Sequence, residues 1–145
     1  MKIYRELEWD KIDSRYIAQD DFSYADVKGR VKRLGCDIVV FYKGSNSFPS
    51  AVAINEYCEY DSFSSEANEL LSRMNFVVRI GDALSRAFDV FGSDYKIDDL
   101  MEEKYHFNIA EDYWVTVSVR DNTIVGIEIV FDEEIVSNIF ECRWQ

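Results

Sequence analysis

The stretch "EDYWVTVSVRDNTIVGIEIVF", residues 111–131, decides the fold class of this chain. Valine, isoleucine and aromatic residues crowd both sides of a central Asp-Asn pair at 121–122. β-Branched and aromatic residues favour strands, and two polar residues between them favour a tight turn. The stretch therefore predicts a β-hairpin in which Val119 faces Ile124 and, with a regular register, Glu128 falls on the valine-rich face.

The two faces of this hairpin differ in polarity. The valine-rich face is the natural seat for a helix, whereas the other face combines Trp114 and Thr116 with the apolar side chains of Ile127 and Ile129. A sheet face that is half polar and half apolar needs a cover. The candidates are the chain's own C-terminal segment with Trp144, a small ligand, or another protein.

Two stretches carry apolar residues at helical spacing. Residues 23–35 predict a short helix with a capping-box start and a glycine end. Residues 65–91 carry an apolar stripe at alternating three- and four-residue steps, which predicts one helix of about 40 Å. A break near Asn75 or Gly81, or a short strand over residues 76–80, is the alternative.

The remaining elements follow from shorter patterns. A hairpin with a longer loop is expected over residues 36–60, with Pro49 at the start of its second strand. The segment from Asp132 onward is either a short helix or a closing strand. The chain is then a single α+β domain, residues 1–145, in which an antiparallel sheet of about five strands packs on one long helix, broken or unbroken, and one or two short helices. Further strands are expected at 3–9 and 105–109.

The charge of the chain is strongly negative. It has 16 basic and 28 acidic residues, a net charge of −12. Residues 1–48 hold nine basic and eight acidic side chains. Residues 49–145 therefore hold the remaining seven basic and twenty acidic side chains. Such a field repels nucleic acids and anionic membranes and speeds encounter with cationic partners. We expect a basic protein partner and no contact with nucleic acid or membrane; solubility alone is the other explanation of the charge.

Catalytic and metal-binding patterns are hard to find. The single histidine, His106, excludes multi-histidine metal sites and every nucleophile-histidine system that does not use this one ring. Glu128 on the predicted core face would be a buried carboxylate suited to acid-base chemistry, but a shifted register explains it more simply. No glycine-rich phosphate loop or metal signature occurs. We expect no enzymatic activity, no cofactor and no metal.

An acidic cluster precedes the strand that contains His106. The carboxylates of Asp98, Asp99, Glu102 and Glu103 would share one face of a helical turn, and they would hold a divalent cation only if other ligands converged there. The sequence supplies no such ligands. We therefore expect a solvated acidic face, against which a basic protein could dock.

Cysteine use and the N-terminal residues predict the compartment. Cys36, Cys58 and Cys142 form no CxxC pair, and no apolar run follows the charges at the N-terminus. A cytoplasmic protein with reduced thiols is the expectation.

In size, acidity and lack of catalytic motifs, the chain resembles the immunity proteins that neutralise bacterial toxins, many of which are basic nucleases. The resemblance implies an acidic protein-binding module whose carboxylates pair with lysine and arginine of the toxin while aromatic residues fill central pockets. No site residue of that class is carried over. The alternatives are a small-molecule-binding or weakly catalytic domain with an aromatic pocket and Glu128 or His106 as its polar group, and a homodimeric structural protein. The expected partner-binding residues are Asp98, Asp99, Glu102, Glu103, Glu111, Asp112 and Trp114.

Overall fold

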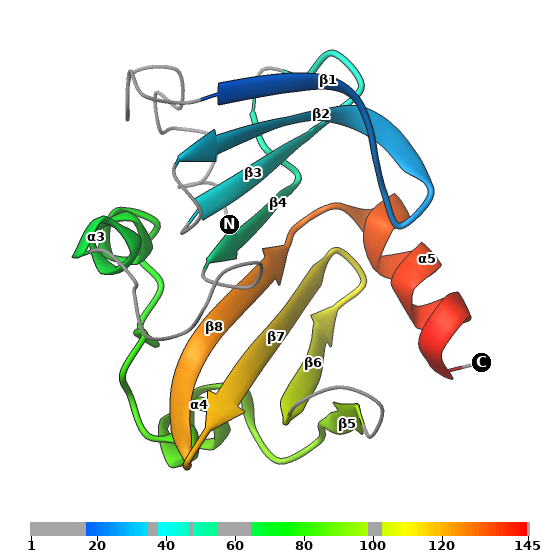
Figure 1. Cartoon of the computed structure of the whole chain (residues 1–145). Helices are drawn as coiled ribbons and strands as arrows, with labels where there is room; N and C mark the ends of the chain where they lie inside the picture. Colours follow the sequence, from blue (N-terminus) through cyan, green and yellow to red (C-terminus); the bar gives the residue numbers. More distant parts are fainter. Residues whose placement is uncertain (1–16, 35–37, 47, 55–64, 99–102, 145) are drawn as a thin grey trace.

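The computed structural model of the chain describes residues 17–34, 38–46, 48–54, 65–98 and 103–144. Within this part of the chain, eight strands form one antiparallel sheet in the order β1-β2-β3-β4-β8-β7-β6-β5. Two four-stranded meanders therefore lie edge to edge, joined where β4 pairs with β8 (Figure 1). The strands are β1 (Ile17–Tyr24), β2 (Val27–Leu34), β3 (Ile38–Lys43), β4 (Ala51–Ile54), β5 (Lys96–Asp98), β6 (Lys104–Ala110), β7 (Tyr113–Arg120) and β8 (Thr123–Val130).

The described helices pack on opposite faces of this sheet. α3 (Ser65–Arg73) and α4 (Leu84–Phe91) follow β4, and α5 (Glu133–Trp144) follows β8. Side chains of α3 and α4 share one apolar cluster with the sheet, and those of α5 share another. Figure 1 shows α5 well apart from α3 and α4. We call the two sides of the sheet the α3/α4 face and the α5 face.

Alternation along the strands divides the core between these faces. In β3, Val40 and Tyr42 point to the α3/α4 face, whereas Val39 and Phe41 point to the α5 face. Each of the two clusters contains residues from both meanders. The core is therefore continuous across the join between β4 and β8.

The expectation of about five strands packed on one long helix is wrong. The sheet has eight strands, and the apolar stripe of residues 65–91 is divided between α3 and α4. Asn75, just after α3, has a positive φ of 57°, and Gly81, just before α4, has a φ of 100°. The alternative of a break near these two residues is confirmed.

Hydrogen bonds that replace those of a helix hold the segment between α3 and α4. The Asn68 side chain donates to the Ile80 carbonyl (3.1 Å) and accepts from the Ile80 N–H (3.0 Å). The Gly81 N–H donates to the carbonyl of Ile124 in β8 (2.8 Å). Burial alternates along residues 76–80, as it does in extended chain. Tertiary pairing to β8 therefore overrides the helical spacing of the apolar residues.

The short helix predicted over residues 23–35 is also wrong, because most of this stretch lies in the β1–β2 hairpin. Ala25 and Asp26 form the turn, with φ values of 47° and 63°. Val27 and Val31 are four residues apart, a spacing that places two side chains on the same side of a helix and also of a strand. Pairing of β2 with β1 and β3 selects the strand.

The hairpin within residues 111–131 is confirmed, with one change of register. Its turn is the Asp-Asn pair at 121–122, in which both residues have positive φ, and Val119 pairs with Ile124 as predicted. Immediately beyond this pair the register shifts by one residue, and Val125 is the extra residue of a β-bulge.

The bulge exchanges the two faces of β8. A regular register predicts Glu128 opposite Val115, but Glu128 pairs with Thr116 and points to the α5 face. Ile127 and Ile129 move to the α3/α4 face, where they join the valines of β7. A one-residue slip has this effect because successive side chains of a strand point to opposite faces.

Several other predictions are confirmed. The hairpin expected within residues 36–60 is β3 and β4, the strand at 105–109 is β6, and the segment after Asp132 is the helix α5. The strand predicted over residues 3–9 and the three cysteine side chains fall outside the described residues. No helix in the described part of the chain is both long enough and apolar enough to cross a membrane.

Candidate functional site

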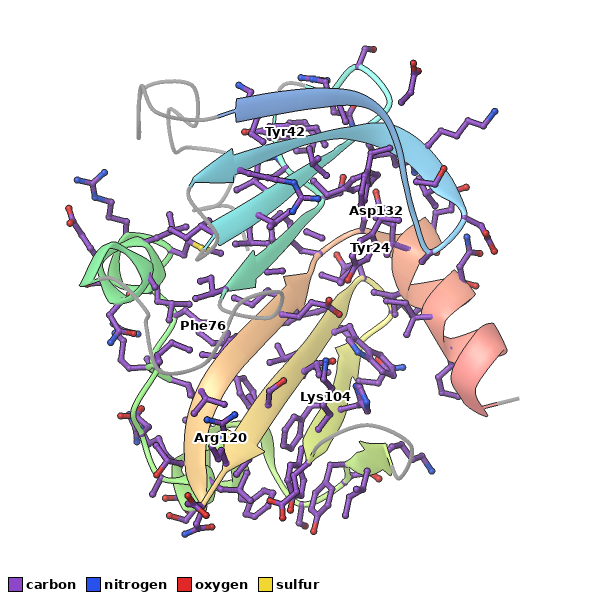
Figure 2. All side chains as sticks on the ribbon, viewed as in Figure 1. Tyr24, Tyr42, Phe76, Lys104, Arg120 and Asp132 are labelled. Atoms are coloured by element: carbon purple, nitrogen blue, oxygen red, sulfur yellow. The ribbon has the colours of Figure 1, made fainter. Side chains whose placement is uncertain are left out.

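The chain's own C-terminal helix covers one end of the second face of the hairpin, at Trp114 and Val130. Asp132, labelled in Figure 2 where β8 passes into α5, accepts the N–H of Ile135 on its Oδ1 (3.1 Å). This bond caps the first turn of the helix. Ile135, Val136 and Ile139 then pack in the same apolar cluster as Trp114. Of the covers considered, the C-terminal segment is observed over this end of the face, and the Trp144 side chain falls outside the described residues.

This arrangement removes Trp114 from the surface. Its side chain is 1% exposed, and its Nε1–H donates to Thr116 Oγ1 (3.1 Å). Ile127, the other residue that a homodimer through this hairpin face would bury, is already buried on the α3/α4 face. A homodimer would therefore have to use a different surface.

Asp98, the first residue of the predicted acidic cluster, does not lie in a helical turn. Asp98 is the last residue of β5 and pairs with Lys104 of β6. Glu103 is exposed just before β6, and Asp99 and Glu102 lie outside the described residues. The two described acids of the cluster, Asp98 and Glu103, lie at one end of β6.

The other predicted acids lie at the opposite end of β6. Glu111 and Asp112 are exposed in the turn between β6 and β7. At about 3.3 Å per strand residue, Glu103 and Glu111 are roughly 26 Å apart along the chain. The predicted acidic contacts that the structure describes therefore form two separate groups rather than one patch.

A groove lies between α5 and this second group of acids. Its volume is about 330 Å³. Glu111 comes from the hairpin side and Glu133 from the helix side, and α5 adds the buried Val136 and the exposed Phe140. We call this the acidic groove. Its described lining residues are Asn108, Glu111, Glu133, Val136, Ser137 and Phe140.

Helical spacing explains why α5 contributes these residues. Glu133, Val136, Ser137 and Phe140 lie at steps of three and four, so they form one stripe along the helix. An acidic side chain in the first turn also interacts favourably with the positive end of the helix dipole. The stripe of α5 beside the groove is thus an ordinary helix face whose first residue, Glu133, is acidic.

Lys43 pairs with some acids at the start of α5 but not with those of the groove. Its Nζ is 2.8 Å from Glu134 Oε1 and 3.4 Å from Asp132 Oδ2. The hydrogen bond to Glu134 is the main cause that raises the pKa of Lys43 above its ordinary value. Among the described residues, no basic side chain lies within ion-pair distance of Glu111 or Glu133. Within the described part of the chain, the two groove carboxylates are thus not neutralised by a cation.

The groove suits a cationic side chain better than a metal ion. Within the described ranges, no group of three or more histidine, cysteine or acidic residues is placed to hold a metal. A lysine or arginine could instead lay its aliphatic stem along Val136 and Phe140 while its charged end meets Glu111 or Glu133. The arrangement is chemically that of a docking site for a basic protein segment.

The polar residues considered for catalysis lie in one cross-strand row on the α5 face. His106 pairs with Thr116, and Thr116 pairs with Glu128. His106 Nδ1 and Thr116 Oγ1 are 2.8 Å apart, and the His106 side chain is 1% exposed. The structure thus places His106 among packed side chains of the sheet, and neither His106 nor Glu128 lines the acidic groove.

Comparisons of the chain with known protein families, with curated proteins and with solved structures give no match. The groove residue that sequence reasoning missed is Glu133. The available signal was the Asp-Glu-Glu run at the start of the predicted helix, but its closeness to Glu111 depends on where α5 crosses the sheet.

Proposed function

We propose that this chain is an acidic protein-binding module that takes a basic partner at the acidic groove, as an immunity-type inhibitor of a basic nuclease toxin would. The observation that carries the proposal is the convergence of Glu111 and Glu133, from two separate elements, on a groove that also exposes Phe140. Charge and apolar surface at one place are what a desolvated lysine or arginine anchor requires.

The charge of the whole chain supports the same kind of partner. A net charge of −12 attracts a cationic protein over a distance and raises its association rate, an effect that weakens as salt is added. Within the groove, Glu111 and Glu133, which no described cation pairs with, would select a lysine or arginine of the partner. A nuclease toxin offers such residues where it binds nucleic acid, so the same contact would block its substrate.

The proposal includes a cytoplasmic site of action and direct binding as the whole mechanism. It assigns no catalytic residue, because the described lining of the acidic groove holds no histidine that could activate the Ser137 hydroxyl as a nucleophile. It also narrows the predicted contacts to Glu111 and Asp112, with Glu133 added, and it leaves out Trp114.

The test compares two charge reversals of equal size. The partner is captured from the native organism with the full chain, purified, and assayed for nucleic acid cleavage with and without this protein. Association rates at low salt are then measured for Glu111→Lys with Glu133→Lys, and for the matched control Asp89→Lys with Asp94→Lys. The control acids are exposed and lie in and after α4, outside the groove.

We expect a basic nuclease that the wild-type chain inhibits. The groove variant should associate about tenfold more slowly or worse and dissociate faster, because it loses both steering and contacts. The control should associate more slowly, because its long-range electrostatic attraction is weaker, and should keep the wild-type dissociation rate. Equal effects of the two variants on both rates would contradict a docking site at the groove, and a captured partner that is not basic would contradict the proposed function.

A further inference from the structure

A second hollow lies on the α5 face, over the first meander. Its volume is about 270 Å³, and it shares no described lining residue with the acidic groove. We call it the β1–β4 pocket, after the strands that supply its walls. The described lining residues are Phe22, Tyr24, Val31, Arg33, Val39, Phe41, Ala51, Val52 and Ala53.

Small residues create the space in this pocket. Ala51 and Ala53 are the residues of β4 that point to the α5 face, where longer side chains would fill the hollow. In β2, Gly29 lets the Phe41 ring lie close to the strand, since a Cβ at Gly29 would come within 2.8 Å of Phe41 Cζ and would clash with the Tyr42 carbonyl oxygen. The hollow is therefore a consequence of the small side chains of Ala51 and Ala53, and Gly29 sets the position of the Phe41 ring that borders it.

Aromatic rings form one side of the pocket. The rings of Tyr24 and Phe41 are stacked with centroids 5.5 Å apart, and the Phe22 ring is 6.2 Å from that of Phe41. Tyr24 is labelled in Figure 2 on the β1–β2 hairpin. The turn of that hairpin is tied to α5 by a hydrogen bond from Asn138 Nδ2 to the Ala25 carbonyl (2.8 Å). The aromatic wall is thus held in place from outside the meander.

Arg33 is the one charged residue among the described lining of the β1–β4 pocket. It is half-buried, and no acceptor or carboxylate among the described residues lies within hydrogen-bond or ion-pair distance of its guanidinium. Pairing across the sheet places Arg33 beside Val39, Val39 beside Ala53, and Ala53 beside Glu128. Three strand spacings of about 4.8 Å each therefore separate the backbone of Arg33 from that of Glu128, roughly 14 Å.

We propose that the β1–β4 pocket binds a small aromatic carboxylate, with the ring system between the aromatic and aliphatic walls and the carboxylate on Arg33. Planar rings pack favourably against Tyr24 and Phe41. A guanidinium binds a carboxylate through two parallel charge-assisted hydrogen bonds, and Arg33 makes no such bond to the described part of the chain.

Size and charge restrict the ligand further. A cavity of roughly 150 Å³ accommodates benzene, so a hollow of about 270 Å³ fits a bicyclic ring of about ten non-hydrogen atoms. A single cation within a chain of net charge −12 suits a monoanion better than a phosphate ester or a nucleotide, which carry more charge. The site is independent of the proposed docking of a basic protein.

Two probes that differ only in charge test this proposal on the wild-type chain. We would titrate the full chain with 2-naphthoate and with 2-naphthamide and measure heat and stoichiometry. We expect one saturable site for the acid and binding that is weaker by about tenfold or more for the amide, the usual scale of one charge-assisted pair. Equal affinities for the two probes, or no saturation by the acid, would overturn the proposal.

Variants then locate the site. Arg33→Gln should abolish the preference for the acid, and Lys28→Gln should preserve it, because Lys28 is a cation of the same strand that faces away from the pocket. Ala53→Leu should fill the hollow and block both probes, with its thermal unfolding checked against wild type. Retention of the preference in Arg33→Gln, or unchanged binding in a folded Ala53→Leu, would show that the acid binds elsewhere and would overturn the assignment.

Discussion

At the scale of single residues, ion pairing decides which acids near the start of α5 are available. Asp132 and Glu134 face Lys43 and are compensated, whereas Glu133, between them in sequence, belongs to the stripe beside the groove. Sequence alone does not separate three consecutive acids in this way. Lys43 comes from β3, and only the fold brings it to the helix start.

Trp114 shows the opposite case, a residue whose expected role changes once its surroundings are known. A tryptophan in a half-polar sheet face is a reasonable contact residue, because its ring is apolar and its N–H needs an acceptor. Here the acceptor is Thr116 of the same strand, and α5 covers the ring. The sequence around Trp114 does not reveal that the chain itself supplies both the acceptor for the indole N–H and the cover for the ring.

The residue scale also gives a prediction about alkaline pH. Burial is the main cause that raises the pKa of the Tyr105 hydroxyl above its ordinary value, with the charge of Glu103 adding to it. The folded state then holds this proton more tightly than the unfolded state, so the stabilisation is complete below about pH 10 and is lost as pH rises through the folded pKa. Lys43, whose pKa is also raised, acts in the same direction from about pH 10.5.

We therefore expect Tyr105→Phe to lose less free energy of unfolding than wild type between about pH 9 and about pH 11. Denaturant unfolding at several pH values in this window is the measurement, with both proteins compared at neutral pH as the reference. If the free energy of unfolding fell equally with pH in the two proteins, Tyr105 would be ruled out as a source of the loss of stability at alkaline pH.

At the scale of elements, the turn of the β7–β8 hairpin was predictable from the sequence. The register of its strands beyond the bulge was not. The Asp-Asn turn and the first pairs follow from residue type, whereas the bulge at Val125 has only Gly126 beside it as a weak local sign. The bulge lets two isoleucines of β8 reach the α3/α4 core and turns Glu128 to the other side. Burial of apolar area on the α3/α4 face favours this register over the regular one.

The start of α5 carries a prediction at the element scale. Asp132 is both the cap of the helix and a partner of Lys43. Asp132→Ala should lower the free energy of unfolding by about 1 kcal/mol, the usual loss for a missing cap. Asp132→Asn should lower it less, because the amide oxygen still accepts the Ile135 N–H and Lys43 keeps Glu134. Chemical denaturation of the three proteins measures this; equal losses for alanine and asparagine would show that the charge, and not the cap, matters.

At the scale of the whole molecule, the two meanders depend on each other. Each apolar cluster takes side chains from both, and β4 and β8 pair at the centre of the sheet. Neither half therefore has a complete core of its own. We expect the domain to unfold as one unit.

Hydrogen exchange tests this cooperativity. The amides of Val40 in β3 and Val117 in β7 belong to interior strands of the two meanders. They should exchange with the same free energy of opening, equal to that of global unfolding. A clearly lower value for one of them would show that its meander opens independently.

The sequence by itself determined the β3–β4 and β7–β8 hairpins, the Asp-Asn turn of the second hairpin, and the strand β6. These features depend on residue type and spacing over a few positions, so local preference decides them. The number of strands, the strand at Val27–Leu34, the bulge and the acidic groove were decided only by the tertiary structure. Each of these arises from pairing or packing between segments far apart in the sequence, such as β4 with β8 or α5 with the end of β6, and local preferences carry no information about those partners.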